Sequence, residues 1–189
     1  MYHISDIKKF LRCQRLYFYG KGENSAFKPY LHSDENMVDL LKEYLGIDEC
    51  YEGIRNDPAD RFFKEIDHYE WFVYPRFMDN EMRINVPFMH KKEDGFDLYY
   101  IHYGTFVKDL DLLTYRIAYK VLQRNNIKVG EIYLIRFNAD YINDGKLDPG
   151  RLFLSDRFFN NKRILNLVKD ADVDYDAYIE KMESFKEDT

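Results

Sequence analysis

The chain has 189 residues, enough for one domain with a substantial core, and 46% of them are hydrophobic. It carries 28 Lys and Arg against 34 Asp and Glu. The resulting formal charge of −6 excludes a general electrostatic attraction to nucleic acid, so such binding would need a local basic groove. The 17 Tyr and 15 Phe residues are many for this length, and we expect most of them in the core.

The cysteine pattern indicates a reducing compartment. Cys13 and Cys50 form no CxxC pair, and the five histidines lack the spacing of zinc ligands. The sequence shows no signal-like segment and no 18-residue apolar stretch. We therefore expect a cytoplasmic protein with no membrane segment, no structural metal and no cofactor.

Residues 1–72 are predicted to be mainly helical. Ser5 is a suitable N-cap for a helix that continues to Gly20, and this helix is basic within an acidic protein. Its cationic residues are Lys8, Lys9, Arg12 and Arg15. A second helix is expected over residues 35–45, with Gly46 ending it, and a short one over residues 58–66.

The periodicity then changes to that of β-strands. In the middle run, hydrophobic residues alternate with Arg83 and Asn85, which therefore share the face opposite the core. In the last run, Tyr100 and His102 share a face with Leu98. The runs cover residues 70–77, 81–89 and 96–104, and their spacing favours an antiparallel meander.

The rest of the chain predicts a crossover and two further helices. An amphipathic helix over residues 110–126 precedes a strand at 131–137, which should lie parallel to the strand at 96–104. Helices are expected over 155–171 and 175–187, after a loop at 143–150. We expect a single domain of 189 residues, an α/β core with a mixed central sheet at 73–145 and C-terminal helices at 146–189.

Two stretches resemble the PD-(D/E)XK nuclease superfamily, in its RecB-like branch that includes the CRISPR-associated adaptation nucleases. ISDIKKFLRCQRLYFY is similar to the opening helix of that branch, and the stretch from Met82 to Tyr141 is similar to its catalytic core. The resemblance implies a restriction-endonuclease-like fold, a bacterial or phage origin and a site for Mg²⁺ or Mn²⁺.

The residues that carry the chemistry of that superfamily are replaced. Its metal-binding aspartate falls on Asn85, and its Glu-x-Lys falls on Tyr100 and His102. Asn and Tyr supply no negative charge to a hard cation at neutral pH. Some members hold an iron–sulfur cluster with four cysteines; only Cys13 matches one of them. The resemblance therefore implies an inactive site with no metal.

Three functions remain open at this point. The first is a nuclease-like protein that binds DNA or RNA without cleaving it; the second is a protein-interaction module on the same scaffold. The third is a metal-dependent nuclease with relocated ligands. For the first, phosphate contacts or base stacking are assigned to Lys8, Lys9, Arg12, Arg15, Arg83, Arg116, Tyr100, Tyr103 and Phe106.

Overall fold

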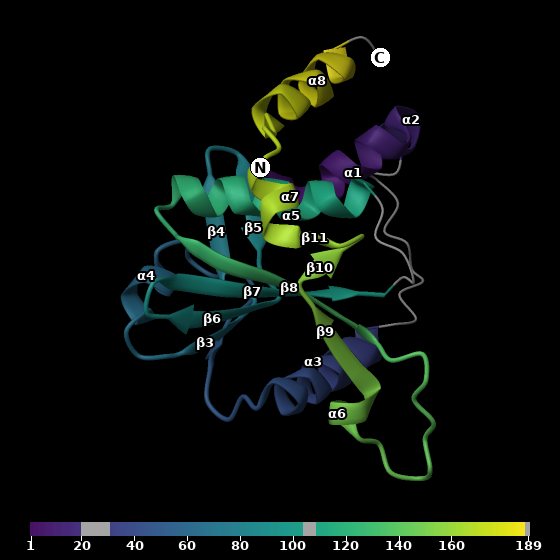
Figure 1. The fold of residues 1–189 in the computed structure, drawn as a ribbon. Coiled ribbons are helices and arrows are strands. Elements are labelled where there is room, and N and C mark those ends of the chain that lie inside the picture. The colour runs from purple at the N-terminus through teal and green to yellow at the C-terminus, as the bar shows by residue number, and fades with distance from the viewer. Residues whose placement is uncertain (20–30, 104–108, 188–189) are drawn as a thin grey trace.

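The computed structural model describes residues 1–19, 31–103 and 109–187, which form an α/β protein with mixed sheets flanked by helices (Figure 1). A six-stranded sheet has the order β2-β3-β6-β7-β8-β9, and a three-stranded sheet has the order β1-β5-β4. The central strands are β2 (Tyr51–Glu52), β3 (Trp71–Val73), β6 (Phe88–Lys92), β7 (Gly95–His102), β8 (Val129–Phe137) and β9 (Phe153–Asp156). The smaller sheet contains β1 (Tyr2–His3), β4 (Arg76–Asp79) and β5 (Met82–Asn85).

The predicted crossover is confirmed. Strand β7 leads through α5 (Asp109–Arg124) to β8, and the two strands are parallel, with Leu98 opposite Ile132 and Tyr100 opposite Leu134. The helix buries Ile117 and its other apolar residues against this part of the sheet. Asn126, with φ of +59°, ends the turn after α5, as its Asn-Asn sequence predicts.

The predicted meander is wrong in one respect, because its first two runs each divide between the two sheets. The first run becomes β3 and β4, and the second becomes β5 and β6. The breaks fall at Tyr74-Pro75 and at Val86-Pro87, where proline cannot donate a hydrogen bond to a ladder. The Tyr74 N–H donates to the Pro87 carbonyl, so both runs turn at the same level.

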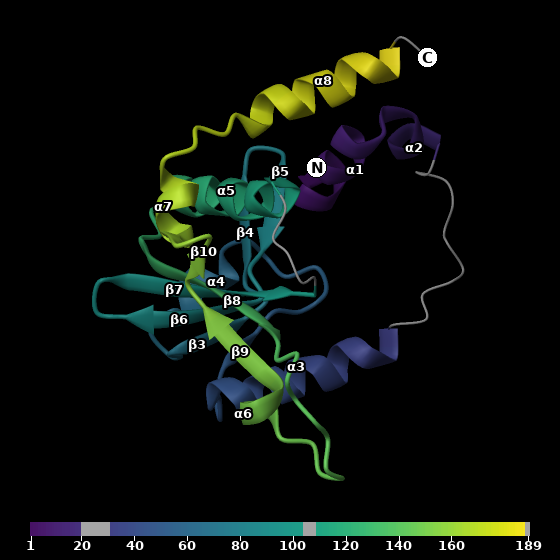
Figure 2. The ribbon, with the colours of Figure 1, turned by 45° about the vertical axis from the view of Figure 1, so that its right-hand side comes forward.

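Helices cover both faces of the central sheet (Figures 1 and 2). On one face, α5 and α7 (Ile164–Lys169) enclose the larger core, which includes Leu98 and Ile132. On the other face, α3 (Leu31–Leu45) packs Leu41 against a smaller core that includes Phe88 and Ile135. Helix α3 begins before the predicted residue 35, and Gly46 ends it with φ of +69°, as expected. The short α4 spans Arg61–Glu65.

The predicted N-terminal helix is divided in two. Helix α1 (Ile4–Arg12) and helix α2 (Gln14–Tyr19) are separated by Cys13, whose backbone is extended. The N-cap is His3 and not Ser5, because β1 pairs with β5 up to that residue and the helix starts directly after it. The Asp6 carboxylate accepts a hydrogen bond from the His3 backbone N–H at 2.9 Å. The predicted stop at Gly20 lies outside the described residues.

The first of the two predicted C-terminal helices is wrong over its first half. Residues there form β9, then a hairpin of β10 (Phe158–Phe159) and β11 (Lys162–Arg163), and only then α7. Asn160 and Asn161 have φ of +47° and +61°, which permits the two-residue turn of this hairpin. The loop after β8 ends in α6 (Pro149–Leu152).

The second predicted C-terminal helix is confirmed as α8 (Tyr175–Glu187). It lies beside α1 and α2, where Phe185 stacks on Phe18 with ring centroids 4.7 Å apart (Figure 2). In the part of the chain that the structure describes, no helix is long and apolar enough to cross a membrane.

Candidate functional site

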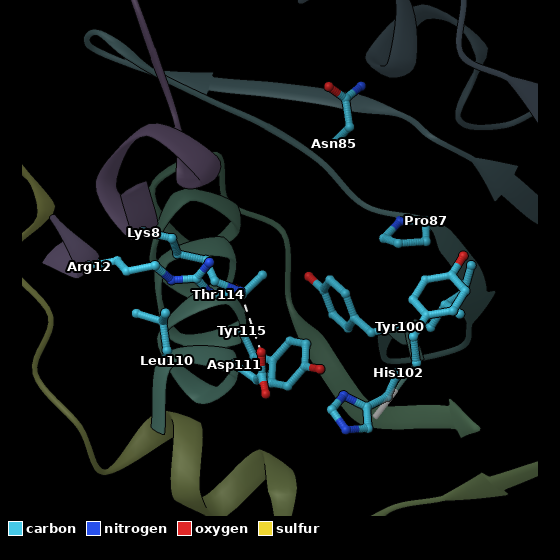
Figure 3. A pocket seen from close by; sticks show the side chains of 12 residues that line it. Lys8, Arg12, Asn85, Pro87, Tyr100, His102, Leu110, Asp111, Thr114 and Tyr115 are labelled. Carbon is cyan, nitrogen blue, oxygen red and sulfur yellow. Dashed lines mark hydrogen bonds and ion pairs between the residues drawn. The ribbon is translucent and has the colours of Figure 1, made fainter. Parts of the chain in front are cut away.

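A cleft of about 520 Å³ opens where α1, α5 and the end of β7 meet (Figure 3). One wall comes from α1 and α5 and the other from β7, with Pro87 before β6 at the rim. The lining residues are Lys8, Arg12, Asn85, Pro87, Tyr100, Ile101, His102, Tyr103, Leu110, Asp111, Thr114 and Tyr115. The crossover from β7 to α5 creates this arrangement, because the strand end and the first turns of the helix must lie close together.

Tyr100 forms the floor of the cleft. Its side chain is 5% exposed, and its ring lies beside that of Tyr115 with centroids 4.7 Å apart (Figure 3). The hydroxyl is buried and has no hydrogen-bond partner among the described residues. Burial, with a smaller contribution from Tyr115, raises the pKa of Tyr100 far above its ordinary value. The floor is therefore a neutral phenol.

The end of β7 supplies two more side chains. His102 is half-buried and is the last residue of the strand, opposite Arg136 of β8. Tyr103 follows it and is 67% exposed, with its ring centroid 6.4 Å from that of Phe137. The strand end thus supplies an imidazole and, from the next residue along the chain, an exposed aromatic ring.

Helix α1 supplies the basic wall. Lys8 and Arg12 are one helical turn apart and both face the cleft (Figure 3). The Lys8 Nζ atom lies 3.4 Å from Asp111 Oδ1 and 3.2 Å from Thr114 Oγ1, so this ammonium is partly neutralised. Arg12 is exposed and takes part in no ion pair within the described residues. The guanidinium of Arg12 is therefore the more available cation.

Asn85 lies at the edge of the cleft with its side chain turned away from Tyr100 (Figure 3). Its amide nitrogen donates to the Tyr74 carbonyl at 3.0 Å. The three positions of the substituted nuclease motif, Asn85, Tyr100 and His102, thus line one cleft without forming one hydrogen-bonded group.

The other residues assigned to nucleic-acid binding lie elsewhere. Arg83 contacts the His3 ring on β1, and Arg116 donates to the Leu167 carbonyl of α7 at 3.3 Å. Lys9 and Arg15 are exposed on α1 and α2 and do not line the cleft. Of that basic set, the structure brings only Lys8 and Arg12 into the cleft, together with Tyr103. Phe106 lies outside the described residues.

Sequence reasoning missed the role of Asp111 in this cleft. Asp109 and Asp111 both lie in the first turn of α5, where the helix dipole alone is enough to explain acidic residues. The signal that distinguishes them is spacing: Asp111 and Thr114 lie three residues apart and therefore share one face of α5. That face is the one opposite Lys8.

The cleft does not fit a divalent metal ion. Among its described lining residues, Asp111 alone carries a carboxylate, and that group is held by Lys8. Mg²⁺ prefers several carboxylate or carbonyl oxygens, which a neutral phenol and an imidazole do not replace. The described part of the chain contains no group of three or more His, Cys, Asp or Glu residues that could hold a metal.

Comparisons with protein-family models, with curated proteins and with solved structures found no match for this chain. The fold and the cleft define an α/β protein with mixed sheets flanked by helices, in which cations and aromatic rings face each other at the end of β7.

Proposed function

We propose that the chain binds nucleic acid in this cleft without cleaving it. The observation that carries the proposal is the pairing of Lys8 and Arg12 on one wall with the exposed Tyr103 on the other. Cationic side chains contact phosphates, and an open aromatic ring stacks on a base. The two recognition elements occupy opposite walls of a cleft whose floor is uncharged.

A single strand suits this cleft better than a duplex. Tyr103 offers its ring to a base face, and such faces are accessible only where bases are unpaired. No sugar-specific contact distinguishes DNA from RNA, so the proposal covers both. The overall charge of −6 gives no long-range help, and binding therefore depends on Arg12 and Lys8.

We propose that the chain does not cleave nucleic acid because the cleft lacks the side chains that would coordinate a catalytic metal ion. Phosphodiester hydrolysis at a metal site depends on carboxylates that place the cation and on a group that activates water. Asn85 and Tyr100 stand where the resembled superfamily has carboxylates, and the Tyr100 hydroxyl is neutral and buried. Loss of one electrostatic element costs about 10²–10³ in rate, and two carboxylates are replaced here.

We further propose that the scaffold is a restriction-endonuclease-like core. The mixed sheet with β6 antiparallel to β7, and with β7 parallel to β8 across α5, supports this proposal. The helix α1 beside the cleft is in keeping with the opening helix of the RecB-like branch. The division of the first two predicted strands between two sheets is a departure that the sequence resemblance did not imply.

Fluorescence anisotropy with labelled single-stranded DNA and RNA tests the binding proposal. The Lys8→Gln/Arg12→Gln variant is expected to bind at least about tenfold more weakly than the wild-type chain. The slope of log affinity against log salt concentration should be shallower by about 1.4, because two phosphate contacts are lost. The matched control is Lys9→Gln/Arg15→Gln, which removes the same charge from α1 and α2 outside the cleft. Equal losses in the two variants would show that general charge, and not the cleft, causes binding.

A cleavage assay with Mg²⁺ and then Mn²⁺ tests the other half of the proposal. We expect the wild-type chain to leave DNA and RNA substrates intact with either metal ion. Cleavage that disappears in an Asn85→Ala/His102→Ala variant would instead identify a metal-dependent nuclease with relocated ligands.

A protein-interaction module is the second candidate, favoured by a separate observation. Among the described strands of the central sheet, β9 is at the edge and pairs only with β8. Leu154 on this strand is paired with Arg136 of β8, and Phe137 is paired with Phe153; Leu154 and Phe137 are each 40% exposed. A Leu154→Ser/Phe137→Ser variant that loses a partner retained by the wild-type chain would support this function. A wild-type chain that is monomeric and retains no partner would count against it.

A further inference from the structure

The outer face of the β1-β5-β4 sheet carries two arginines, Arg76 and Arg83, that form no ion pair with any residue in the described part of the chain. Strand pairing places His3 opposite Arg83, and Asn85 opposite Arg76. The alternate residues of these strands, Tyr2, Met82, Ile84 and Phe77, point into the core, so the cationic residues share the other face. Arg76 and Arg83 are diagonal neighbours in an antiparallel pair, roughly 7–8 Å apart at the backbone and within reach of each other as long side chains.

Both guanidinium groups are incompletely satisfied. Arg83 donates from Nη2 to His3 Nε2 at 2.7 Å, and Arg76 donates from Nη1 to the Asp57 carbonyl at 2.7 Å. The Nε atoms of both arginines are buried without a hydrogen-bond partner among the described residues. Neither arginine forms an ion pair there, although 13 other contacts between opposite charges are present in that part of the chain.

The carboxylates of Asp57 and Asp6, two acidic residues that contact this group, are already engaged. Asp57 accepts hydrogen bonds from the Tyr51 hydroxyl at 2.7 Å and from Arg61 at 3.2 Å, and it meets Arg76 only through its backbone carbonyl. Asp6 accepts from the His3 backbone. Two guanidinium groups in partial burial repel each other unless an anion lies between them. Burial, followed by the charge of Arg76, lowers the pKa of Arg83, in keeping with an uncompensated pair.

We propose that this face is a phosphate-binding site, with Arg76 and Arg83 as the ligands that contact the phosphate and His3 as the residue that positions Arg83. A phosphate group has enough oxygen atoms to accept hydrogen bonds from both guanidinium groups at once, through the terminal nitrogens that their contacts with Asp57 and His3 leave unused. His3 holds the Arg83 fork through Nη2, and the other terminal nitrogen, Nη1, makes no hydrogen bond to a described residue. The site does not depend on the function proposed for the cleft, although Asn85 borders both.

Calorimetric titration of the whole chain with inorganic phosphate tests this site. The wild-type chain is expected to bind saturably, and Arg83→Gln and Arg76→Gln each to weaken binding about tenfold to a hundredfold, because each removes charge-assisted hydrogen bonds. Arg83→Lys keeps the charge but loses the fork, so its affinity should lie between those of the wild-type chain and Arg83→Gln. Arg151→Gln, on α6 at the other end of the molecule, is the matched control and should bind as the wild-type chain does (Figure 1).

Thermal unfolding separates a lost ligand contact from a lost fold. Phosphate should raise the Tm of the wild-type chain and of Arg151→Gln but not that of Arg83→Gln or Arg76→Gln. Each arginine variant has its own reference Tm without phosphate, because Arg76→Gln also removes the hydrogen bond to the Asp57 carbonyl and Arg83→Gln the contact with His3. Absence of saturable phosphate binding by the wild-type chain, or wild-type affinity in both arginine variants, would overturn the proposal.

The source of the phosphate is resolved with oligonucleotides. Single strands that differ only in a 5′-phosphate are compared on the wild-type chain and on Arg83→Gln. A strand preference that Arg83→Gln abolishes supports a terminal phosphate of nucleic acid as the ligand. A loss of affinity for inorganic phosphate alone supports a free phosphate or a small phosphate ester, and it leaves the cleft proposal untouched.

Discussion

Lys8 on α1 and Asp111 on α5 pair along the wall of the cleft that these two helices form, with Nζ and Oδ1 3.4 Å apart. Both side chains are a little over a quarter exposed, so solvent screens the pair and its contribution to stability is small. Its effect on ligand binding is larger, because Asp111 places a negative charge where a phosphate would approach Lys8. The pair therefore sets how much of the basic wall is available.

Removal of that negative charge should strengthen nucleic-acid binding. In Asp111→Asn, Lys8 loses its counter-charge and becomes available to a phosphate, so we expect affinity for single strands to rise about three- to tenfold at low salt. Anisotropy titrations at two salt concentrations measure the change. Asp109→Asn is the control, since Asp109 is exposed in the same helical turn and does not line the cleft. An unchanged affinity in Asp111→Asn would place the phosphates away from Lys8.

The buried hydroxyl of Tyr100 should destabilise the folded state. Because it has no partner among the described residues, Tyr100→Phe removes an unsatisfied polar group and keeps the ring contact with Tyr115. We expect the free energy of unfolding in urea to stay equal or to rise by up to about 1 kcal/mol. Nucleic-acid affinity should not fall.

Tyr141→Phe provides the contrast for that measurement. The Tyr141 hydroxyl accepts from the Asp148 N–H at 3.1 Å and donates to the Lys146 carbonyl at 3.4 Å. Its removal should lower the free energy of unfolding by about 0.5–1.5 kcal/mol. A larger loss in Tyr100→Phe than in Tyr141→Phe would mean that the Tyr100 hydroxyl has a partner that supports the fold.

The sequence predicts those elements whose pattern is local. The helix α5 and the strand β8 follow from one apolar stripe and one apolar run, and a crossover between parallel strands has only one common hand. The predicted helix over 155–171 was wrong because that stretch contains two patterns. Its first half has a hairpin pattern, with Phe158 and Phe159 before the turn residues Asn160-Asn161, and the helical spacing of its second half obscured it. The division of strands at Pro75 and Pro87 was also readable, because each proline interrupts a run that was taken as continuous.

The candidate site was predictable only in part, for a geometric reason. Lys8 and Arg12 share a helix face, and Tyr100 and His102 share a strand face, so local periodicity places each pair correctly. Which pairs then meet depends on packing between distant segments. The contact of Arg83 with His3 requires a parallel pairing across about 80 residues, which no short-range pattern encodes.

Asp79 should stabilise the attachment of α8 in a pH-dependent way. Its carboxylate accepts hydrogen bonds from Tyr175 and Arg124, which join β4 to α8 and α5. Burial raises the pKa of Asp79, but these two hydrogen bonds outweigh burial and leave the pKa below its ordinary value. A depressed folded-state pKa stabilises the fold above the unfolded-state pKa of about 3.9, and this contribution disappears as the pH falls through the folded-state value.

Thermal unfolding of the wild-type chain and of Asp79→Asn checks that linkage. At pH 7 the free energy of unfolding of the variant should be about 1–3 kcal/mol lower than that of the wild-type chain, because a charged acceptor of two hydrogen bonds is replaced. The difference in Tm should narrow steadily below about pH 4. Asp172→Asn is the control, since that exposed carboxylate only approaches Lys120 at 3.8 Å. A difference in Tm that is constant from pH 7 to pH 3 would contradict the linkage.

Trp71 should report the protonation of His90. It is the single tryptophan of the chain, and its ring stacks on the His90 imidazole with centroids 4.0 Å apart and planes 9° from parallel. Burial, and then the charge of Lys92, lower the pKa of His90, while Glu70 opposes them. The folded state should therefore hold this imidazole neutral below pH 6.5, and it should lose stability as the pH falls through that range, because the unfolded chain binds the proton more readily.

The measurement is a pH titration of Trp71 fluorescence in the folded range. We expect quenching on acidification with a midpoint below 6.5, because the imidazolium forms against the indole ring. His90→Gln should flatten the curve, whereas His68→Gln, which changes a neighbouring histidine outside the stack, should preserve it. A midpoint above 6.5 would show that attraction between the imidazolium and the indole face exceeds the cost of burial. In that case His90 would be charged near neutral pH, and this end of the sheet would carry a cation that pairs with Glu70.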